Sequence, residues 1–358
     1  MADDFKYHID HHASLVPPPE LVDARAARLR DTLDDAGLRA VEEAAVIDGL
    51  RMQRRLGLTA LSDGEFRRRN HLAVTYDAIA GFGATPQPGA ALADLVGPLH
   101  APEIRQLDRS PAGGGRLTKY ETDFLLASAD RPTLVALASP GFLAELTTQT
   151  VDVSASGAEL ARILRDEIAA MAADGIRYVL LRNPAYTFLL TEPGREHARA
   201  LGIDPESTMD RMLEADAQVL SGLETPAEFR VGLDITTAGA ASGGYDVAAV
   251  RRFGARLPFD RLCVEFPAEL GRRFPLGELP PSTVVSLGIV DVSDPELESV
   301  EELVGRIDDA ATIVDIDNIA ISTNGGFHAA RQPPSAATQR AKLQLVEMVA
   351  RYFWGNEL

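Results

Sequence analysis

Cysteine, long apolar runs and net positive charge are all scarce in this chain of 358 residues. The single cysteine, Cys263, excludes an internal disulfide framework. No apolar run is long enough to cross a bilayer, and the N-terminus carries two acids instead of the apolar stretch of a signal peptide. The net charge of −18 argues against a surface for nucleic acids or anionic membranes. We therefore expect a cytoplasmic protein that binds neither.

Nucleotide-binding motifs are missing as well. No Gly-x-Gly-x-x-Gly follows a predicted strand and there is no P-loop, which argues against an open doubly wound sheet. Short apolar segments instead alternate with helical segments, and this pattern predicts a parallel sheet with crossover helices. Eight such segments favour a closed (β/α)8 barrel, an α/β fold. The predicted strands cover residues 5–10, 58–61, 133–138, 176–181, 229–235, 261–266, 283–290 and 319–322.

One region interrupts this alternation. Residues 79–119 are rich in glycine and proline, and they predict loops and a β-hairpin outside the repeat. The hydrophobic content of 46% is sufficient for one large core. We expect a single barrel domain over residues 1–358 that carries this excursion in its N-terminal part. The composition leaves a homo-oligomer open.

Polar side chains collect at the C-terminal ends of the predicted strands, where a barrel builds its active site. Several carboxylates, an arginine and two imidazoles at one mouth exceed what solvation requires, because unpaired buried charge is costly. Asp234 and Thr236 are two residues apart and so point to the same side of their strand. The candidates in chain order are His11, His12, Ser14, Asp63, Glu65, Ser139, Arg182, Asn183, Asp234, Thr236, Glu265, Asp291 and Asn324.

Two further features lie close to these candidates. Arg67 and Arg68 directly follow Glu65, and their position predicts a role in binding an anion. Cys263 precedes Glu265 by two residues on the same strand, so it shares its face but lies deeper. A single buried thiol of this kind is expected to pack in the core.

Five segments stand in a specific order and spacing. They are His12–Leu15, Ser62–Arg68, Val231–Thr236, Glu265 and Ile321–Phe327. Together they resemble the catalytic domain of cobalamin-independent methionine synthase in its short stand-alone form. The resemblance covers nearly the whole chain and implies a (β/α)8 barrel, in agreement with the count of strands.

The resemblance also implies a catalytic zinc for members of that family. They hold it with a histidine and a cysteine on strand five, a glutamate on strand six and a cysteine after strand eight, and it turns a thiol substrate into a thiolate that attacks an alkyl group. This chain has Asp234, Thr236, Glu265 and Asn324 there, so only the glutamate is kept. Zinc favours thiolate and imidazole ligands, and we predict no zinc and no cofactor. The alternative is a hard divalent ion, magnesium or manganese, on Asp234, Glu265 and Asn324.

The substrate implied by the resemblance is also altered. The family holds the substrate amino group with an acidic residue at the end of strand four, where this chain has Arg182 followed by Asn183. Glu65, used near the amino group, is kept, and the Ser14 region that receives the carboxylate is kept in part. Arginine repels an ammonium but binds a carboxylate or phenolate in a bidentate contact. We therefore expect a small anionic partner instead of homocysteine.

Three functions follow as hypotheses. The first is an enzyme of lyase, hydrolase or alkyl-transfer type that uses acid–base chemistry without zinc. The second is a methyltransferase of the methionine synthase family, from 5-methyltetrahydrofolate to a thiol, with an atypical metal site. The third is a non-catalytic barrel that binds a metabolite. For the first, the catalytic candidates are Glu65, Asp234, Glu265, His11 and His12, and the substrate-binding candidates are Ser14, Arg182, Asn183, Thr236, Asn324, Arg67 and Arg68.

Overall fold

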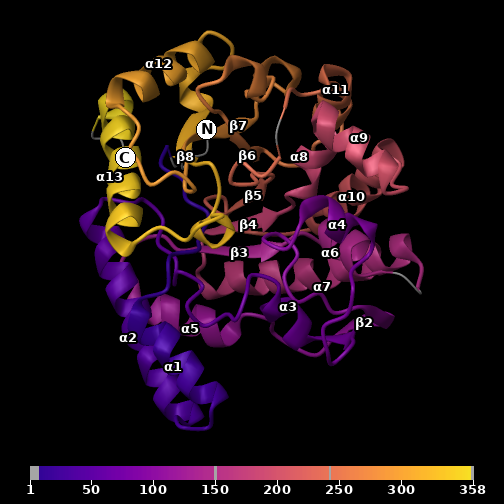
Figure 1. Cartoon of the computed structure of the whole chain (residues 1–358), viewed down its shortest axis with the longest axis vertical. Coiled ribbons are helices and arrows are strands. Elements are labelled where there is room, and N and C mark those ends of the chain that lie inside the picture. The colour runs from indigo at the N-terminus through magenta and orange to yellow at the C-terminus, as the bar shows by residue number, and fades with distance from the viewer. Residues whose placement is uncertain (1–7, 149–150, 242, 356–358) are drawn as a thin grey trace.

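Six parallel strands follow one another in chain order through the middle of the molecule (Figure 1). The computed structural model describes residues 8–148, 151–241 and 243–355. Nearly all residues of these strands are buried, as expected for apolar strands that are covered on both faces. The strands are β3 (Leu134–Ala138), β4 (Tyr178–Arg182), β5 (Arg230–Asp234), β6 (Arg261–Glu265), β7 (Val284–Val290) and β8 (Ile319–Thr323).

The two remaining segments predicted as strands are 5–10 and 58–61, and of these residues 8–10 and 58–61 lie between β8 and β3 and close the barrel through isolated bridges. Residues 5–7 of the first lie outside the described residues. Proline at position 132 has no N–H to extend the ladder beside Leu61, although its carbonyl accepts from the Leu61 N–H at 2.8 Å. The predicted parallel barrel is confirmed, with two strands shorter than expected. The bridges are Ile9 with Ile321, Ser14 with Gly64, and Leu61 with Thr133.

Helices surround the sheet (Figure 1). The longest, α7, begins after Asp152, whose side chain accepts from the Ala155 N–H at 2.7 Å, and ends at Gly175 with φ +113°. Short 3₁₀ turns cover 270–272, 276–278, 316–318 and 327–329. The helices after β3 are α6 (Pro140–Thr147), α7 (Val153–Asp174), α8 (Ala185–Leu190), α9 (Glu192–Ala200), α10 (Pro205–Leu220), α11 (Val247–Gly254), α12 (Val300–Ala311) and α13 (Ala336–Trp354).

The N-terminal part adds elements outside the barrel repeat. Helices α1 (Pro19–Leu29) and α2 (Asp35–Arg55) lie side by side at one end of the molecule (Figure 1). In the segment 79–119, strands β1 (Ile79–Phe82) and β2 (Leu107–Gly113) pair antiparallel. The remaining helices of this part are α3 (Ala73–Ala78), α4 (Ala91–Val96) and α5 (Lys119–Ser128).

The barrel interior contains a buried ion pair. Arg261 Nη2 lies 2.9 Å from Asp10 Oδ2, and the Tyr178 hydroxyl donates to the same oxygen at 3.2 Å. Cys263 packs beside them without any exposed surface, and burial raises the pKa of its thiol well above the ordinary value. This position agrees with the core role expected from the sequence.

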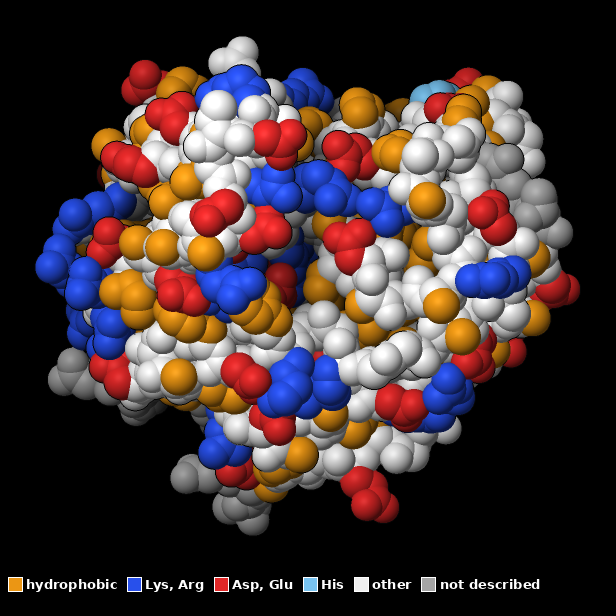
Figure 2. Space-filling model, turned by 90° about the horizontal axis from the view of Figure 1, so that it is seen from below, with side chains coloured by type: hydrophobic (Ala, Val, Ile, Leu, Met, Phe, Trp, Pro, Cys, Tyr) orange, Lys and Arg blue, Asp and Glu red, His pale blue; other side chains and the backbone are white. Residues whose placement is uncertain are grey.

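Acidic and basic side chains are interspersed over the face shown in Figure 2, around a central hollow. No large area of one charge covers that face. Among the described residues, no helix is long and apolar enough to cross a membrane.

Candidate active site

A small cavity lies at the C-terminal ends of the barrel strands. Three of the sequence candidates, Arg182, Asp234 and Thr236, line it. The other lining residues are His71, His100, Ala138, Phe142, Pro184, Gly326, His328 and Ala329.

The register of the sheet explains why Arg182 and Asp234 meet. Arg182 is the last residue of β4 and Asp234 the last of β5, and the two are direct partners in the parallel ladder. Side chains alternate along a strand, so Leu180 lies on the same face as Arg182, two residues deeper. On β4 the face that carries Tyr178 and Leu180 thus ends in the charged Arg182, and the pairing with Asp234 brings both charges to the mouth.

His12 and Asp234 form a buried ion pair beside the cavity. His12 Nδ1 lies 2.6 Å from Asp234 Oδ2, and Nε2 lies 2.9 Å from the carbonyl oxygen of Thr323. Both partners are acceptors, so both ring nitrogens donate and the ring is an imidazolium. Burial by itself lowers the pKa of His12, but Asp234 raises it above the ordinary value. Asp234 Oδ1 accepts from the N–H (2.9 Å) and hydroxyl (2.6 Å) of Thr236, and the pKa of Asp234 is lowered despite burial.

Arg182 is held by the carboxylate of Glu65, and one nitrogen of its guanidinium has no partner within the described ranges. Its Nη1 donates to Glu65 Oε1 at 2.8 Å, and its Nη2 donates to the main-chain carbonyl of His12. The same Glu65 oxygen accepts from Arg68 Nη1 at 2.9 Å, while Arg68 Nη2 donates to Glu121 at 2.7 Å. Arg182 is 5% exposed, and its Nε has no hydrogen-bond partner among the described residues. A buried guanidinium N–H without a partner is costly, and a bound anion would satisfy it.

Asp63 lies next to this charged network. Its Oδ1 accepts from the Glu65 N–H at 2.9 Å, which supports the left-handed backbone of Glu65 (φ +58°). Its Oδ2 is buried and bonded to no group in the described part of the chain. Burial raises the pKa of Asp63 to about 7, and the negative charge of Glu121 contributes. Asp63 is therefore a carboxyl group that exchanges its proton near neutral pH.

The residues present do not fit the zinc site that the resemblance implies for the family. Both carboxylate oxygens of Asp234 already accept hydrogen bonds, one from His12 and the other from Thr236, as described above. Glu265 Oε1 accepts from the N–H (2.7 Å) and hydroxyl (2.6 Å) of Thr237. The Asn324 amide oxygen accepts from a backbone N–H at 3.0 Å. Over the described ranges, no three His, Cys, Asp or Glu side chains come together in a way that could hold a metal ion.

Several candidates lie outside the lining of the cavity. Asn183 is fully buried, and its amide nitrogen points to Ser139 Oγ (3.1 Å) and Asp216 Oδ2 (3.4 Å). Glu265 and Asn324 make the main-chain contacts given above. Ser14 contacts the lining indirectly, because its Oγ lies 2.8 Å from His328 Nδ1.

Arg67 and His11 contact neighbouring parts of the fold and do not line the cavity. The guanidinium carbon of Arg67 lies 4.2 and 4.3 Å from the ring centroids of Tyr120 and Phe124. These contacts connect α5 to the loop after Glu65. His11 Nε2 donates to the carbonyl of Ala60 at 2.8 Å, and burial lowers the pKa of this ring. Neither His11 nor His12 lines the cavity, but His12 contacts the lining residue Asp234, and Arg68 supports Glu65.

Sequence reasoning missed three histidines of the cavity lining. His71 ends the run that begins at Arg67, His100 lies in the glycine- and proline-rich excursion, and His328 follows β8. Each is an isolated histidine without ligand spacing to another, so no local pattern distinguishes it from a structural residue. Only the fold brings them together.

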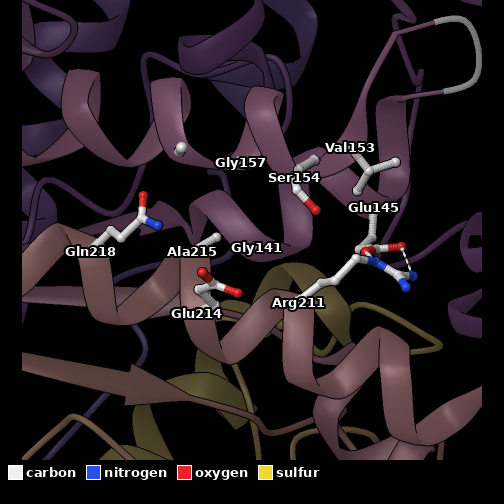
Figure 3. Close-up of a pocket in the computed structure, with 11 residues that line it drawn as sticks. Gly141, Glu145, Val153, Ser154, Gly157, Arg211, Glu214, Ala215 and Gln218 are labelled. Atoms are coloured by element: carbon white, nitrogen blue, oxygen red, sulfur yellow. Dashed lines mark hydrogen bonds and ion pairs between the residues drawn. The ribbon is translucent and has the colours of Figure 1, made fainter.

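A second hollow lies outside the barrel, between α6, α7 and α10 (Figure 3). Its walls are mainly small residues, including Gly141, Gly157 and Ala215, and the Glu145–Arg211 ion pair (2.6 Å) lies at one side. The two charged side chains of this pair are bonded to each other. We therefore place the candidate site at the barrel mouth.

A parallel barrel with a charged cavity at the C-terminal ends of its strands has the arrangement in which β/α-barrel enzymes hold their active sites. Comparison with solved structures specifies the fold further. The chain aligns with a Listeria monocytogenes protein assigned as a vitamin-B12-independent methionine synthase, with a TM-score of 0.76, 20% identity and 98% of each chain covered. A B12-independent methionine synthase from Shewanella sp. W3-18-1 gives a TM-score of 0.71 at 16% identity, over 97% of this chain and 98% of the other. The chain therefore has the cobalamin-independent methionine synthase-like fold.

The other matches are a structure with a lower TM-score and two uncharacterised proteins. A methyltransferase from Methanosarcina mazei aligns with a TM-score of 0.51 at 13% identity, over 98% of this chain and 95% of the other. The uncharacterised Bacillus subtilis proteins YxjH and YxjG are 25% and 23% identical, each over 97% of this chain and 95% of the relative. No family model matches the chain.

Proposed function

We propose that the protein is an enzyme that binds a small organic anion at Arg182 and acts on it by acid–base chemistry without the zinc of the methionine synthase family. Two observations support this most directly: Arg182 lines the cavity at the strand ends, and its buried Nε–H has no partner among the described residues. An anion beside Arg182 would receive a charge-assisted hydrogen bond from a guanidinium whose position is fixed by Glu65 and the main-chain carbonyl of His12.

The His12–Asp234 pair would supply the proton. It stores one exchangeable proton, on the 2.6 Å hydrogen bond between Nδ1 and Oδ2. If that proton passes through Asp234 to the ligand, His12 becomes neutral and keeps Nε2–H on the carbonyl of Thr323. The pair therefore fits a general acid facing an anion on Arg182, and Glu65 fits a positioning residue for Arg182.

The methyltransferase hypothesis has less support. It requires a zinc ion that turns a thiol into a thiolate, and the aspartate, threonine and asparagine at the corresponding positions are poor zinc ligands. The fold is shared with methionine synthases and a methyltransferase, and this similarity concerns the barrel alone.

We expect protein expressed in zinc-supplemented medium to carry far less than one zinc per chain after dialysis, since the corresponding positions offer neither imidazole nor thiolate. Elemental analysis by inductively coupled plasma mass spectrometry measures this, with a protein of known zinc content as the standard. One zinc per chain would contradict the prediction and would favour the methyltransferase hypothesis.

Replacing Arg182 with glutamine is expected to weaken the binding of propionate by about 10- to 150-fold, the equivalent of roughly 1.5–3 kcal/mol for a hydrogen bond to a charged group. Isothermal titration calorimetry measures the affinity. Arg177→Gln is the matched control, because Arg177 pairs with Glu228 at the surface and should not affect binding. Arg182→Lys, which keeps the charge but not the planar fork, should be intermediate. Equal affinities of wild type and Arg182→Gln would refute the anchor.

A further inference from the structure

Three histidines from distant parts of the chain surround the position proposed for the ligand. His71 and His328 have ring centroids 4.6 Å apart, and His100 lines the same cavity from the excursion. The proposed acid–base step uses none of them. Their polar atoms therefore remain to be explained by what the cavity binds.

The hydrogen bonds of two rings determine which nitrogen carries the proton. His71 Nε2 lies 3.1 Å from the carbonyl oxygen of His100, and His100 Nε2 lies 3.1 Å from the carbonyl oxygen of Thr237. A carbonyl only accepts, so each Nε2 carries a hydrogen. Within the described residues, the Nδ1 atoms of His71 and His100 have no hydrogen-bond partner, and in a neutral ring Nδ1 is an acceptor.

The third ring is adaptable. His328 Nδ1 lies 2.8 Å from Ser14 Oγ, and a hydroxyl can donate or accept in that bond. The nearby Gly326 leaves the space for this contact, because a Cβ there would lie 2.5 Å from Ser14 Oγ and 2.6 Å from His328 Nδ1. His328 Nε2 can thus either donate to a ligand or accept from it.

All three rings are neutral at physiological pH. Burial lowers the pKa of His71 to about 3 and that of His100 to about 4, and the positive charge of Arg182 adds to the effect at His71. Burial also lowers the pKa of His328 well below its ordinary value. The cavity therefore offers one cationic donor, Arg182, beside three neutral imidazoles and the carboxylate of Asp234, whose oxygens already accept from His12 and Thr236.

The donor and acceptor pattern selects a ligand with one negative charge and neutral O–H groups. A carboxylate would satisfy Arg182 Nε, and a hydroxyl hydrogen would satisfy an imidazole Nδ1. An ammonium is disfavoured, because it would be a second positive charge beside Arg182. The oxygens of Asp234 already accept hydrogen bonds from His12 and Thr236, so Asp234 cannot balance that charge. The apolar walls, Ala138, Phe142 and Ala329, match a short carbon skeleton.

We propose that the cavity takes a small hydroxycarboxylate, with its carboxylate on Arg182 and its hydroxyl donating to Nδ1 of His71. This assignment rests on the proposed function, because it uses the same anchor. It adds the neutral ring of His71 as the determinant that distinguishes a hydroxylated acid from its deoxy and amino analogues.

The matched series of lactate, propionate and alanine tests this assignment, because its members share a skeleton and differ at one group. Isothermal titration calorimetry with both enantiomers of lactate should show one enantiomer binding about tenfold more tightly than propionate, as one additional hydrogen bond provides. Alanine should bind more weakly than propionate. Equal binding of lactate and propionate would overturn the hydroxyl contact and leave the anchor standing. Absence of binding by lactate and propionate would overturn the proposed function itself, and the hydroxycarboxylate assignment with it.

His71→Gln isolates the hydroxyl contact. Glutamine keeps an N–H for the carbonyl of His100 but removes the ring acceptor, so lactate affinity should fall about tenfold to that of propionate while propionate affinity stays unchanged. His197→Gln, at an exposed position on α9, is the matched control and should leave both affinities unchanged. A parallel loss of lactate and propionate affinity in His71→Gln would overturn the assignment.

Discussion

Glu65→Gln is expected to destabilise the protein by about 3–5 kcal/mol, the cost of removing one partner from a buried ion pair. Glu65 Oε1 is shared by Arg68 and Arg182, at 2.9 and 2.8 Å. Arg68 would keep Glu121, but Arg182 would be left as a buried cation without a counter-ion. Arginine cannot lose its proton to escape this cost, as a histidine or lysine could.

Urea denaturation of wild type and Glu65→Gln at pH 7 measures the loss. The matched control is Glu43→Gln, because Glu43 is partly exposed and lies 3.4 Å from Arg67, where such a change costs about 0–1 kcal/mol. Propionate should stabilise Glu65→Gln more than it stabilises wild type, since it would replace the missing anion on Arg182. A loss below about 1 kcal/mol would show that Glu65 does not balance this charge.

Asp63→Asn is expected to stabilise the protein at alkaline pH, in contrast to Glu65→Gln. The folded-state pKa of Asp63 is about 7, raised by burial from the ordinary value of 3.8. Between these two pH values the folded protein binds more protons than the unfolded chain, so wild-type stability falls as the pH rises through this window. Above pH 7 the folded protein bears the full cost of a buried, poorly partnered carboxylate, whereas asparagine cannot ionise.

Stability curves from pH 4 to 8 measure the difference. Asp63→Asn should equal wild type near pH 4 and exceed it by roughly 2–4 kcal/mol at pH 8, since one unit of pKa corresponds to about 1.4 kcal/mol. Asp48→Asn, at an exposed position on α2, is the control and should follow wild type throughout. A variant that is less stable than wild type at pH 8 would contradict a raised pKa and indicate that Asp63 is needed as an anion.

The barrel was predictable because apolar periodicity is a local signal. Segments such as 176–181 and 261–266 are continuous buried strands in the structure, with ends shifted by two residues or fewer. The segments 5–10 and 58–61 show the same pattern, but their described residues, 8–10 and 58–61, form isolated bridges instead of continuous strands, since backbone pairing depends on the opposite strand as well. Their apolar residues still pack inside the barrel: Ile9 is 2% exposed and Leu61 is fully buried.

The candidate site was predictable in part. The positions of Arg182, Asp234 and Thr236 at strand ends placed them at the mouth, because all strands of a parallel barrel end at the same face. The partners of these residues were not predictable, because hydrogen bonds such as His12 to Asp234 span 222 positions. Asn183 is a candidate for which position at a strand end was misleading. It directly follows Arg182, but its amide nitrogen points to Asp216 on α10 and not into the cavity.

The sequence by itself determined the fold class, because the fold class depends on residue type and order along the chain. The tertiary structure alone decided the charge states and the free donors of the cavity. A carboxylate such as Asp63 or a ring such as His71 acquires its proton affinity from burial and from neighbours distant in sequence. Those neighbours are set by packing, and packing also leaves Arg182 Nε as the donor that a bound anion would satisfy.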